Sequence, residues 1–146
     1  MINIKIKKIK NDARIPTKST IHAAGYDLYA CLDNESVKIM PQTNIKIGTG
    51  LSFELPHGYM SLIFARSGIA TKESLRPANC VGVIDSDYRG EYIVPLFNDS
   101  NEIKTVKNNE RIAQLVILPY PEISFNEVDE LSTTSRGENG FGSSGK

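Results

Sequence analysis

The sequence lacks both an excess of either charge and any long apolar run. Its 17 lysine and arginine residues balance 17 aspartate and glutamate residues, which disfavours proteins that hold DNA mainly by neutralising phosphates. No apolar run approaches the ~20 residues of a membrane-spanning helix. Residues 1–10 alternate isoleucine and lysine and lack the continuous apolar core of a signal peptide. We therefore expect a cytoplasmic protein, or one of the host cell interior if the source is viral, with neither membrane nor nucleic acid as partner.

Cysteine and histidine are also scarce. Cys31 and Cys80 lie far apart, and neither they nor His22 and His57 show a spacing typical of zinc ligands. We predict that both thiols are reduced and have no redox role.

What the sequence does contain favours β-structure. Isoleucine and valine total 24 residues, against 18 for leucine and alanine, and β-branched residues suit pleated sheets. Residues 2–7 alternate apolar and polar side chains, as in a half-buried strand. Turn signals separate further expected strands at 37–40, 44–47, 51–55, 59–64, 80–84, 92–97, 103–106 and 111–118. We predict an all-β, jelly-roll-like barrel with at most one short helix, after Ser67.

The last eleven residues, RGENGFGSSGK (136–146), differ from the rest of the chain. They contain four of the eleven glycines and one large apolar residue, Phe141. Such a segment cannot form its own core and should be mobile alone. We therefore divide the chain into a barrel domain over residues 1–135 and a flexible arm over 136–146. The composition is compatible with a frayed tail or cloning remnant, and equally with an arm that closes over an active site.

Five strings carry the functional signal. In chain order they are AAGYDLYA (23–30), ARSGIA (65–70), GVIDSDYRGEY (82–92), NERIAQ (109–114) and RGENGFGSSG (136–145). Together they resemble the five ordered motifs of the trimeric dUTPases. The resemblance implies a homotrimer of jelly-roll barrels that hydrolyses dUTP to dUMP and pyrophosphate with Mg²⁺. Such an enzyme keeps uracil out of DNA and supplies dUMP for thymidylate synthesis.

The motifs contain the donors that a triphosphate requires. Cleavage of a phosphoanhydride needs its spread negative charge to be held and a water molecule to be aligned, and guanidinium groups bind phosphate in a bidentate manner. The resemblance assigns Arg66, Ser67 and Gln114 to the phosphate chain, with Gly68 allowing close approach and Arg111 as a further donor. It assigns Arg136, Gly142, Ser143 and Ser144 to closure over the far end of that chain.

Two acidic residues are candidates for the chemistry itself. Asp85 follows the apolar run 81–84, where a carboxylate can be held rigidly and act as a general base. The resemblance assigns it the water that attacks the α-phosphorus, although a turn aspartate is the alternative interpretation. We expect Asp27 to act indirectly, through water bound to Mg²⁺ or by orienting other groups, because the three phosphates already offer hard oxygen ligands.

Recognition of the base and sugar is expected from a β-hairpin over residues 79–93. The resemblance places Asn79 at the uracil edge, Tyr88 against the deoxyribose and Phe141 over the base ring. Gly82 and Ile93 complete this part of the predicted site. The alternatives are that Tyr88 is a core aromatic residue and that Phe141 belongs to a tail.

Some features depart from the family pattern. Asn109 stands where the fourth motif usually has glycine, and asparagine is among the residues most tolerant of positive φ. Ala65 replaces a frequent proline, and Ser144 replaces a frequent threonine. Lys5, Lys7, Lys8 and Lys10 form a basic face that the resemblance does not explain, and we expect them to lie on a solvated edge strand.

Two other functions compete with dUTP hydrolysis. A dCTP deaminase, or a bifunctional deaminase–pyrophosphatase, can use the same fold, but deamination needs a glutamate beside the base. A non-catalytic nucleotide sensor on this scaffold is the second alternative. Asp85 and the complete set of motifs favour hydrolysis over both.

Overall fold

The computed structural model describes residues 2–140, which form eleven strands and one short helical segment. The strands are β1 (Lys5–Lys8), β2 (Tyr26–Tyr29), β3 (Ser36–Ile39), β4 (Asn44–Gly48), β5 (Leu51–Glu54), β6 (Tyr59–Phe64), β7 (Leu75–Pro77), β8 (Gly82–Ile84), β9 (Ile93–Asn98), β10 (Lys104–Lys107) and β11 (Arg111–Pro119). A five-residue π-helical turn, η1 (Ile69–Glu73), follows β6. The prediction of an all-β fold with one short helix after Ser67 is therefore confirmed.

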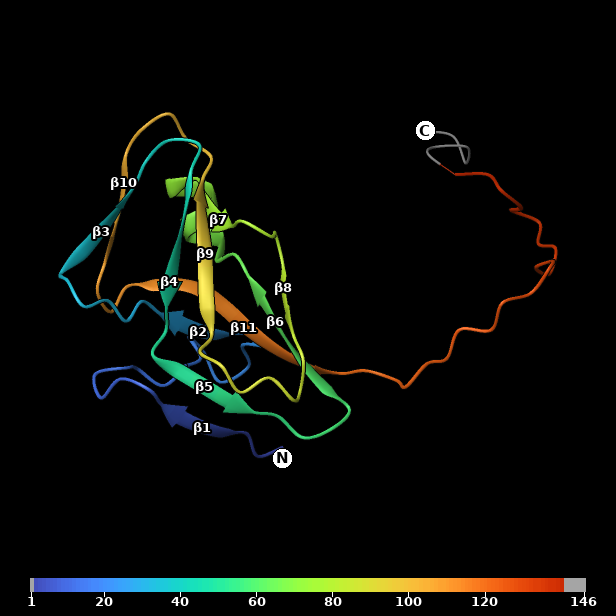
Figure 1. Cartoon of the computed structure of the whole chain (residues 1–146). Coiled ribbons are helices and arrows are strands. Elements are labelled where there is room, and N and C mark those ends of the chain that lie inside the picture. The colour runs from blue at the N-terminus through green and yellow to red at the C-terminus, as the bar shows by residue number, and fades with distance from the viewer. Residues whose placement is uncertain (1, 141–146) are drawn as a thin grey trace.

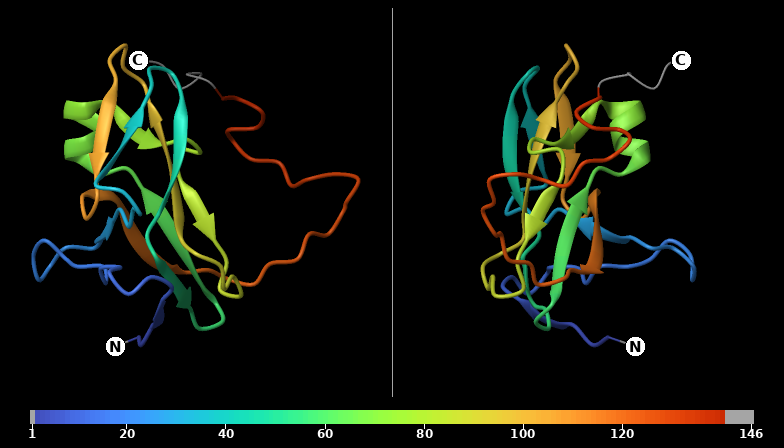
Figure 2. Two further views of the ribbon diagram at one scale, coloured as in Figure 1. Left: turned by 60° about the vertical axis from the view of Figure 1, so that its left-hand side comes forward. Right: turned by 90° about the vertical axis from the view of Figure 1, so that its right-hand side faces the viewer.

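The strands form four antiparallel sheets. The largest has the order β2-β11-β6-β8, and a three-stranded sheet has the order β4-β9-β7. Strand β1 pairs with β5, and β10 pairs with β3. Figures 1 and 2 show these strands around a common interior, with η1 on the outside. All four residues of β1 are exposed, and among residues 2–140 it pairs with β5 alone, as expected for a lysine-rich edge strand. Lys10 lies beyond β1 and forms an ion pair with Asp33.

Alternate residues of β9 and consecutive residues of β2 and β5 contribute to the interior. The largest fully buried apolar side chains include Leu28, Ile39, Ile47, Leu51, Tyr92, Leu96 and Ile112. Burial of each such side chain contributes about 1.5–3 kcal/mol. The buried polar residue Asn98 donates to the carbonyl oxygens of Ile39 and Glu102, so its amide is satisfied where β9 ends.

Two strands were not expected from the sequence. In β2 the last three of its four residues are buried, so the period of two that marks a half-buried strand is absent. Strand β7 has only three residues and includes Pro77, which argues against a strand in a sequence pattern. Conversely, the run expected at 80–84 begins as a strand only at Gly82, because Cys80 has a φ of 62° and lies in a turn.

The chain leaves the barrel after β11. The amide of Tyr120 still donates to the carbonyl of Gly58, and residues 120–140 then continue as extended chain away from the strands (Figure 1). Three of the apolar side chains of this segment are largely exposed: Ile123 (71%), Phe125 (95%) and Leu131 (87%). The last strand ends at Pro119, and the division of the chain at residue 135 stays a prediction. Within residues 2–140 we find no helix with the length and apolarity needed to cross a bilayer.

Candidate active site

The predicted phosphate-binding residues of three motifs meet in the sheet β2-β11-β6. Gln114 in β11 pairs with Asp27 in β2 on one side and with Phe64 in β6 on the other. Arg66 follows β6 by two residues, and Arg111 begins β11. Strand pairing thus brings Arg111 to Asp27, from which it is 84 positions away in the sequence.

Asp27 lies at the centre of this cluster. Its side chain is largely buried, with 12% exposed, and its two oxygens accept from different guanidinium groups. Arg66 Nε donates to Oδ1 at 2.7 Å, and Arg111 Nη1 donates to Oδ2 at 3.2 Å. Because each arginine uses one N–H group here, the remaining N–H groups of both can bind an anionic ligand. The orienting role predicted for Asp27 fits this geometry.

Gln114 is held between the first and second motifs. Its Nε2 donates to the carbonyl oxygen of Ala65 at 2.8 Å. On its other side, a Cβ added to Gly25 would lie only 2.7 Å from Gln114 Oε1, so a larger residue there would displace this amide. The amide of Gln114 therefore fixes the backbone directly before Arg66.

Ser67 and Gly68 form the approach to η1. Ser67 is exposed, and its carbonyl oxygen accepts from the Thr71 hydroxyl at 2.7 Å. Gly68 has ordinary helical angles, and an added Cβ would meet open space. Both residues lie beside Arg66 in sequence and can approach a ligand bound there.

Arg136 is not part of this cluster in the structure. It lies on the extended segment, where its Nε donates to the carbonyl oxygen of Asn139 at 2.9 Å. Phe141, Gly142, Ser143 and Ser144, the other arm residues predicted to contact substrate, fall outside the described residues.

The predicted base and sugar site lies at the end of β8. A groove of about 230 Å³ is lined by Asp85, Tyr88, Ile93, Val83, Ile84, Glu91 and Tyr92. Asp85 is exposed, and Tyr88 is 44% exposed. Asn79 and Gly82 are not among the lining residues, and Asn79 Nδ2 is 3.5 Å from where a Cβ on Gly82 would be. Of the five predicted base and sugar residues, the groove itself brings together Tyr88 and Ile93, and it places the catalytic candidate Asp85 with them.

The expected hairpin over 79–93 differs from the structure in its pairing. Strand β8 pairs with β6, whereas β9 pairs with β4 and β7. The two strands therefore belong to different sheets, and the residues between them form a turn that connects the sheets. This arrangement leaves the turn Asp85–Gly90 open to a ligand instead of closing it into a two-stranded ladder.

Several residues that shape this region were not predicted from the sequence. Tyr92 is fully buried, its hydroxyl is 2.7 Å from Ser61 Oγ, and burial raises the pKa of its phenol. Arg76 forms an ion pair with Asp99 and donates to the carbonyl oxygens of Pro77 and Ala78, directly before Asn79. The side-chain partners Ser61 and Asp99 are 31 and 23 positions away from Tyr92 and Arg76, so they leave no local signal, although Glu91 and Tyr92 do lie inside the third motif.

The two parts of the candidate site are separated along β6. Ile84 pairs with Ser61, and the chain then runs toward the start of β6, whereas Arg66 lies beyond its end. A strand advances about 3.3 Å per residue, so Asp85 and Arg66 of one chain are on the order of 15–20 Å apart along it. A single chain does not place its general-base candidate beside its own arginines.

The barrel thus carries a groove with an exposed carboxylate and, apart from it, two arginines around a buried aspartate, a donor set that suits a phosphorylated ligand. The dUTPase family model matches residues 11–145. The chain is 49% identical to a deoxyuridine 5′-triphosphate nucleotidohydrolase of Nautilia profundicola, over 99% of this chain and 100% of that protein. A Desulfitobacterium hafniense protein of the same name is 48% identical, over 99% of this chain and 97% of that protein.

A solved structure agrees with these relatives. The dUTPase of Staphylococcus bacteriophage 80alpha, in a mutant form with dUpNHpp, has a TM-score of 0.88 and 30% identity, with 99% of each chain covered. The chain belongs to the dUTPase family.

Proposed function

We propose that this protein hydrolyses dUTP to dUMP and pyrophosphate. The observation that carries the proposal is the cluster in which Asp27 binds both Arg66 and Arg111 while Gln114 fixes the backbone before Arg66. Two separate motifs thus supply pre-oriented donors for a polyphosphate, and a third supplies the carboxylate that orients the arginines. Membership of the dUTPase family and the analogue bound to the phage relative support the nucleotide.

In the proposed reaction Asp85 is the general base. Its exposed carboxylate borders the groove that also contains Tyr88, so it can accept a proton from a water molecule that attacks the α-phosphorus. Arg66, Ser67, Arg111 and Gln114 bind the phosphate oxygens and stabilise the charge that develops as the bond to the leaving pyrophosphate breaks.

Among the described residues, the donor set is suited to Mg²⁺ that arrives bound to the phosphates of the substrate. They contain no group of three or more histidine, cysteine, aspartate or glutamate side chains that could hold a metal ion, and both oxygens of Asp27 already accept from arginines. Magnesium is commonly bound by substrate phosphates with one or two carboxylates and several waters. When bound, it would neutralise phosphate charge, with Asp27 acting through water or through the arginines.

Specificity is proposed to come from the turn after β8. Asn79 would bind the uracil edge, and Gly82 leaves room beside its amide. Cytosine presents a donor where uracil presents an acceptor, so its binding would leave buried polar groups without partners. Tyr88 and Ile93 would border the deoxyribose, and Phe141 would cover the base. Arg136, Gly142, Ser143 and Ser144 would close over the phosphates as parts of the arm.

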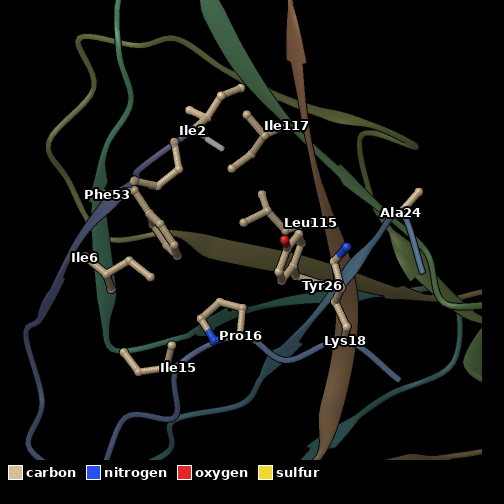
Figure 3. A pocket seen from close by; sticks show the side chains of 11 residues that line it. Ile2, Ile6, Ile15, Pro16, Lys18, Ala24, Tyr26, Phe53, Leu115 and Ile117 are labelled. Atoms are coloured by element: carbon tan, nitrogen blue, oxygen red, sulfur yellow. The ribbon is translucent and has the colours of Figure 1, made fainter. Parts of the chain in front are cut away.

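We propose that the active unit is a homotrimer in which neighbouring chains complete each site. The separation of Asp85 from Arg66 along β6 supports this assembly. A second observation is an apolar pocket of about 530 Å³ beside β2 and β11 that Ile2, Ile6, Phe53, Leu115 and Ile117 help to line (Figure 3). The pocket and the exposed apolar side chains of residues 120–131 are surfaces that association can bury.

The test is to measure product release from four nucleotides with Mg²⁺. We expect pyrophosphate from dUTP and little from dCTP, dTTP or UTP. Release of ammonia from dCTP would instead indicate a deaminase, and tight dUTP binding without pyrophosphate release would indicate a sensor. Removal of the metal with a chelator should abolish turnover. A protein with the expected activity would keep uracil out of DNA and supply dUMP for thymidylate synthesis in the cytoplasm.

A further inference from the structure

We propose that Arg89 is a positioning residue that holds the turn Asp85–Gly90 in the shape that places Tyr88 beside Asp85. This inference rests on the proposed function, in which both residues border the bound nucleotide. Arg89 lies in the third motif, yet the proposed reaction does not use its charge. Its side chain lines a second groove, of about 530 Å³, together with residues of β1 and β5.

The guanidinium group of Arg89 bridges two carbonyl groups of its own turn. Its Nη1 donates to the carbonyl oxygen of Ser86 at 2.6 Å and to that of Tyr88 at 3.1 Å. Because Nη1 carries two N–H groups, this one nitrogen can serve both acceptors. Hydrogen bonds from a charged donor are stronger than those between neutral groups. The side chain therefore ties the beginning of the turn to its end.

The two bridged peptide groups have no other hydrogen-bond partner among residues 2–140. A peptide group is planar, so a bond to its carbonyl also fixes the amide that follows. The carbonyl of Ser86 shares its plane with the amide of Asp87, and the carbonyl of Tyr88 shares its plane with the amide of Arg89. Within the described chain, all four groups bond only through the Arg89 side chain. Without it, the turn would keep only the bond from the Tyr88 amide to the Asp85 carbonyl, which is long at 3.3 Å.

The strands fix the ends of the turn but not its middle. Before the turn, Ile84 pairs with Ser61 in β6. After it, the Tyr92 amide donates to the carbonyl of Leu51, which fixes the peptide group whose carbonyl accepts from the Tyr88 hydroxyl. The tip of the Tyr88 ring is thus held independently of Arg89. The backbone from which the ring projects is the part that depends on the guanidinium group.

The carboxylates of the second groove do not compete for this guanidinium group. Glu54 pairs with Lys5 at 2.7 Å, and Glu91 Oε1 accepts from the amide of Gly50 at 2.7 Å. Within the described residues, Arg89 forms no ion pair. Its charge therefore serves the carbonyl groups of the turn and not a salt bridge between strands.

Loss of the bridge should loosen the turn and slow the reaction. Small displacements of catalytic groups are costly, and about 1 Å can cost about 10²-fold in rate. Arg89→Met keeps a side chain of similar length but removes every donor. Because the tip of the Tyr88 ring remains held, we expect kcat/KM for dUTP to fall by about tenfold. The NMR order parameters of the amides in residues 86–89 should fall from about 0.85, typical of a rigid backbone, to below about 0.6.

The experiment compares Arg89→Met, Arg89→Lys and Lys7→Met with the wild-type protein. Arg89→Lys keeps the charge but loses the planar, rigid arrangement of donors. Lys7→Met is the matched control, because Lys7 is exposed and lines the same groove, so this variant removes one positive charge without altering the turn. Amide order parameters are measured without nucleotide, together with Tm. For each variant, kcat/KM for dUTP is measured at about 0.1 M and 1 M salt, where the Debye length is about 10 Å and 3 Å.

The proposal expects lower order parameters and lower kcat/KM in Arg89→Met at both salt concentrations, and only partial recovery in Arg89→Lys. Lys7→Met should keep wild-type order parameters, and at high salt it should match wild-type kcat/KM. Unchanged order parameters or a normal kcat/KM in Arg89→Met would overturn the proposal. A defect that disappears at high salt, or that Arg89→Lys repairs fully, would also overturn it and indicate attraction of the nucleotide by charge alone. If the wild-type protein fails to hydrolyse dUTP, the proposed function is refuted, and the order parameters still decide whether Arg89 holds the turn.

Discussion

At the scale of single residues, Asp27 shows how a charge can be buried and used. A carboxylate with so little exposure is costly unless it is paired and hydrogen-bonded. Arg66 and Arg111 provide that pairing through separate oxygens. In return, Asp27 orders two long side chains before any ligand binds, which lowers the entropy cost of binding a polyphosphate.

Asp85 offers the sharpest test of catalysis at this scale. Asp85→Asn keeps the size of the side chain but removes its ability to accept a proton from water, so we expect kcat to fall by about 10²–10⁴-fold. Because Asp85 is exposed, Tm and binding of a non-hydrolysable dUTP analogue should change little. Asp87→Asn, in the same turn, is the control and should keep near-normal turnover. A near-normal kcat in Asp85→Asn would mean that Asp85 is a turn residue and not the general base.

The buried pair of Ser61 and Tyr92 tests the energetics of the barrel beneath the groove. Both side chains are fully buried, and their hydroxyl oxygens are 2.7 Å apart. Ser61→Ala or Tyr92→Phe alone leaves one buried hydroxyl without its partner and should lower the free energy of unfolding by about 1–3 kcal/mol. The double variant should lose less than the sum of the two. Denaturant unfolding measures all three, and strictly additive losses would mean that the hydroxyls do not interact.

At the scale of secondary structure, alternation and turn residues locate most strands. The expected runs at 37–40, 44–47, 59–64 and 111–118 match strands to within about one residue at each end. The failures have physical causes. Strand β2 buries Asp27 by pairing it with arginines, so a charged residue occupies an interior position. A pattern of apolar and polar residues cannot show that a charge is buried when its partners lie elsewhere in the chain.

The turn between β10 and β11 provides a prediction at this scale. Asn109 has a φ of 63°, as its replacement of a usual glycine had led us to expect, and the turn leads directly to Arg111. Asn109→Ala should lower the free energy of unfolding by about 1–2 kcal/mol, because alanine is strained in the left-handed region. Asn109→Gly should be neutral or slightly stabilising. Asn101→Ala, at an exposed loop position without positive φ, is the control, and equal effects of the two alanine substitutions in thermal unfolding would contradict this account.

At the scale of the whole molecule, the sequence predicts which residues form the site but not how they meet. The five motifs identify Arg66, Arg111 and Asp27 separately. Their contacts join positions 39 and 84 residues apart and depend on the order β2-β11-β6 in the sheet. Nothing local in the chain specifies that order. The distance between Asp85 and Arg66 has the same origin, because it follows from which end of β6 each motif adjoins.

That distance leads to a prediction about assembly. If each site takes Asp85 from one chain and the arginine cluster from another, two inactive variants should complement each other. Asp85→Asn and Arg66→Ala chains, unfolded together in equal amounts and refolded, should recover about a quarter of wild-type pyrophosphate release, since random association in a symmetric ring gives that share of intact sites. Light scattering should give a mass of three chains for the active species.

The control mixture separates assembly from general rescue. Arg66 and Arg111 bind the same Asp27 within one chain. Whichever chain supplies one of these arginines to a site therefore supplies the other. Mixing Arg66→Ala with Arg111→Ala chains leaves every site without one of the two arginines, and activity should stay at the level of the separate variants. Recovery in this control, or none in the mixture of Asp85→Asn with Arg66→Ala, would show that the site is not divided between chains. Because Asp85 lies toward the start of β6 and Arg66 beyond its end, we expect activity to recover in the mixture of Asp85→Asn with Arg66→Ala and not in the control mixture.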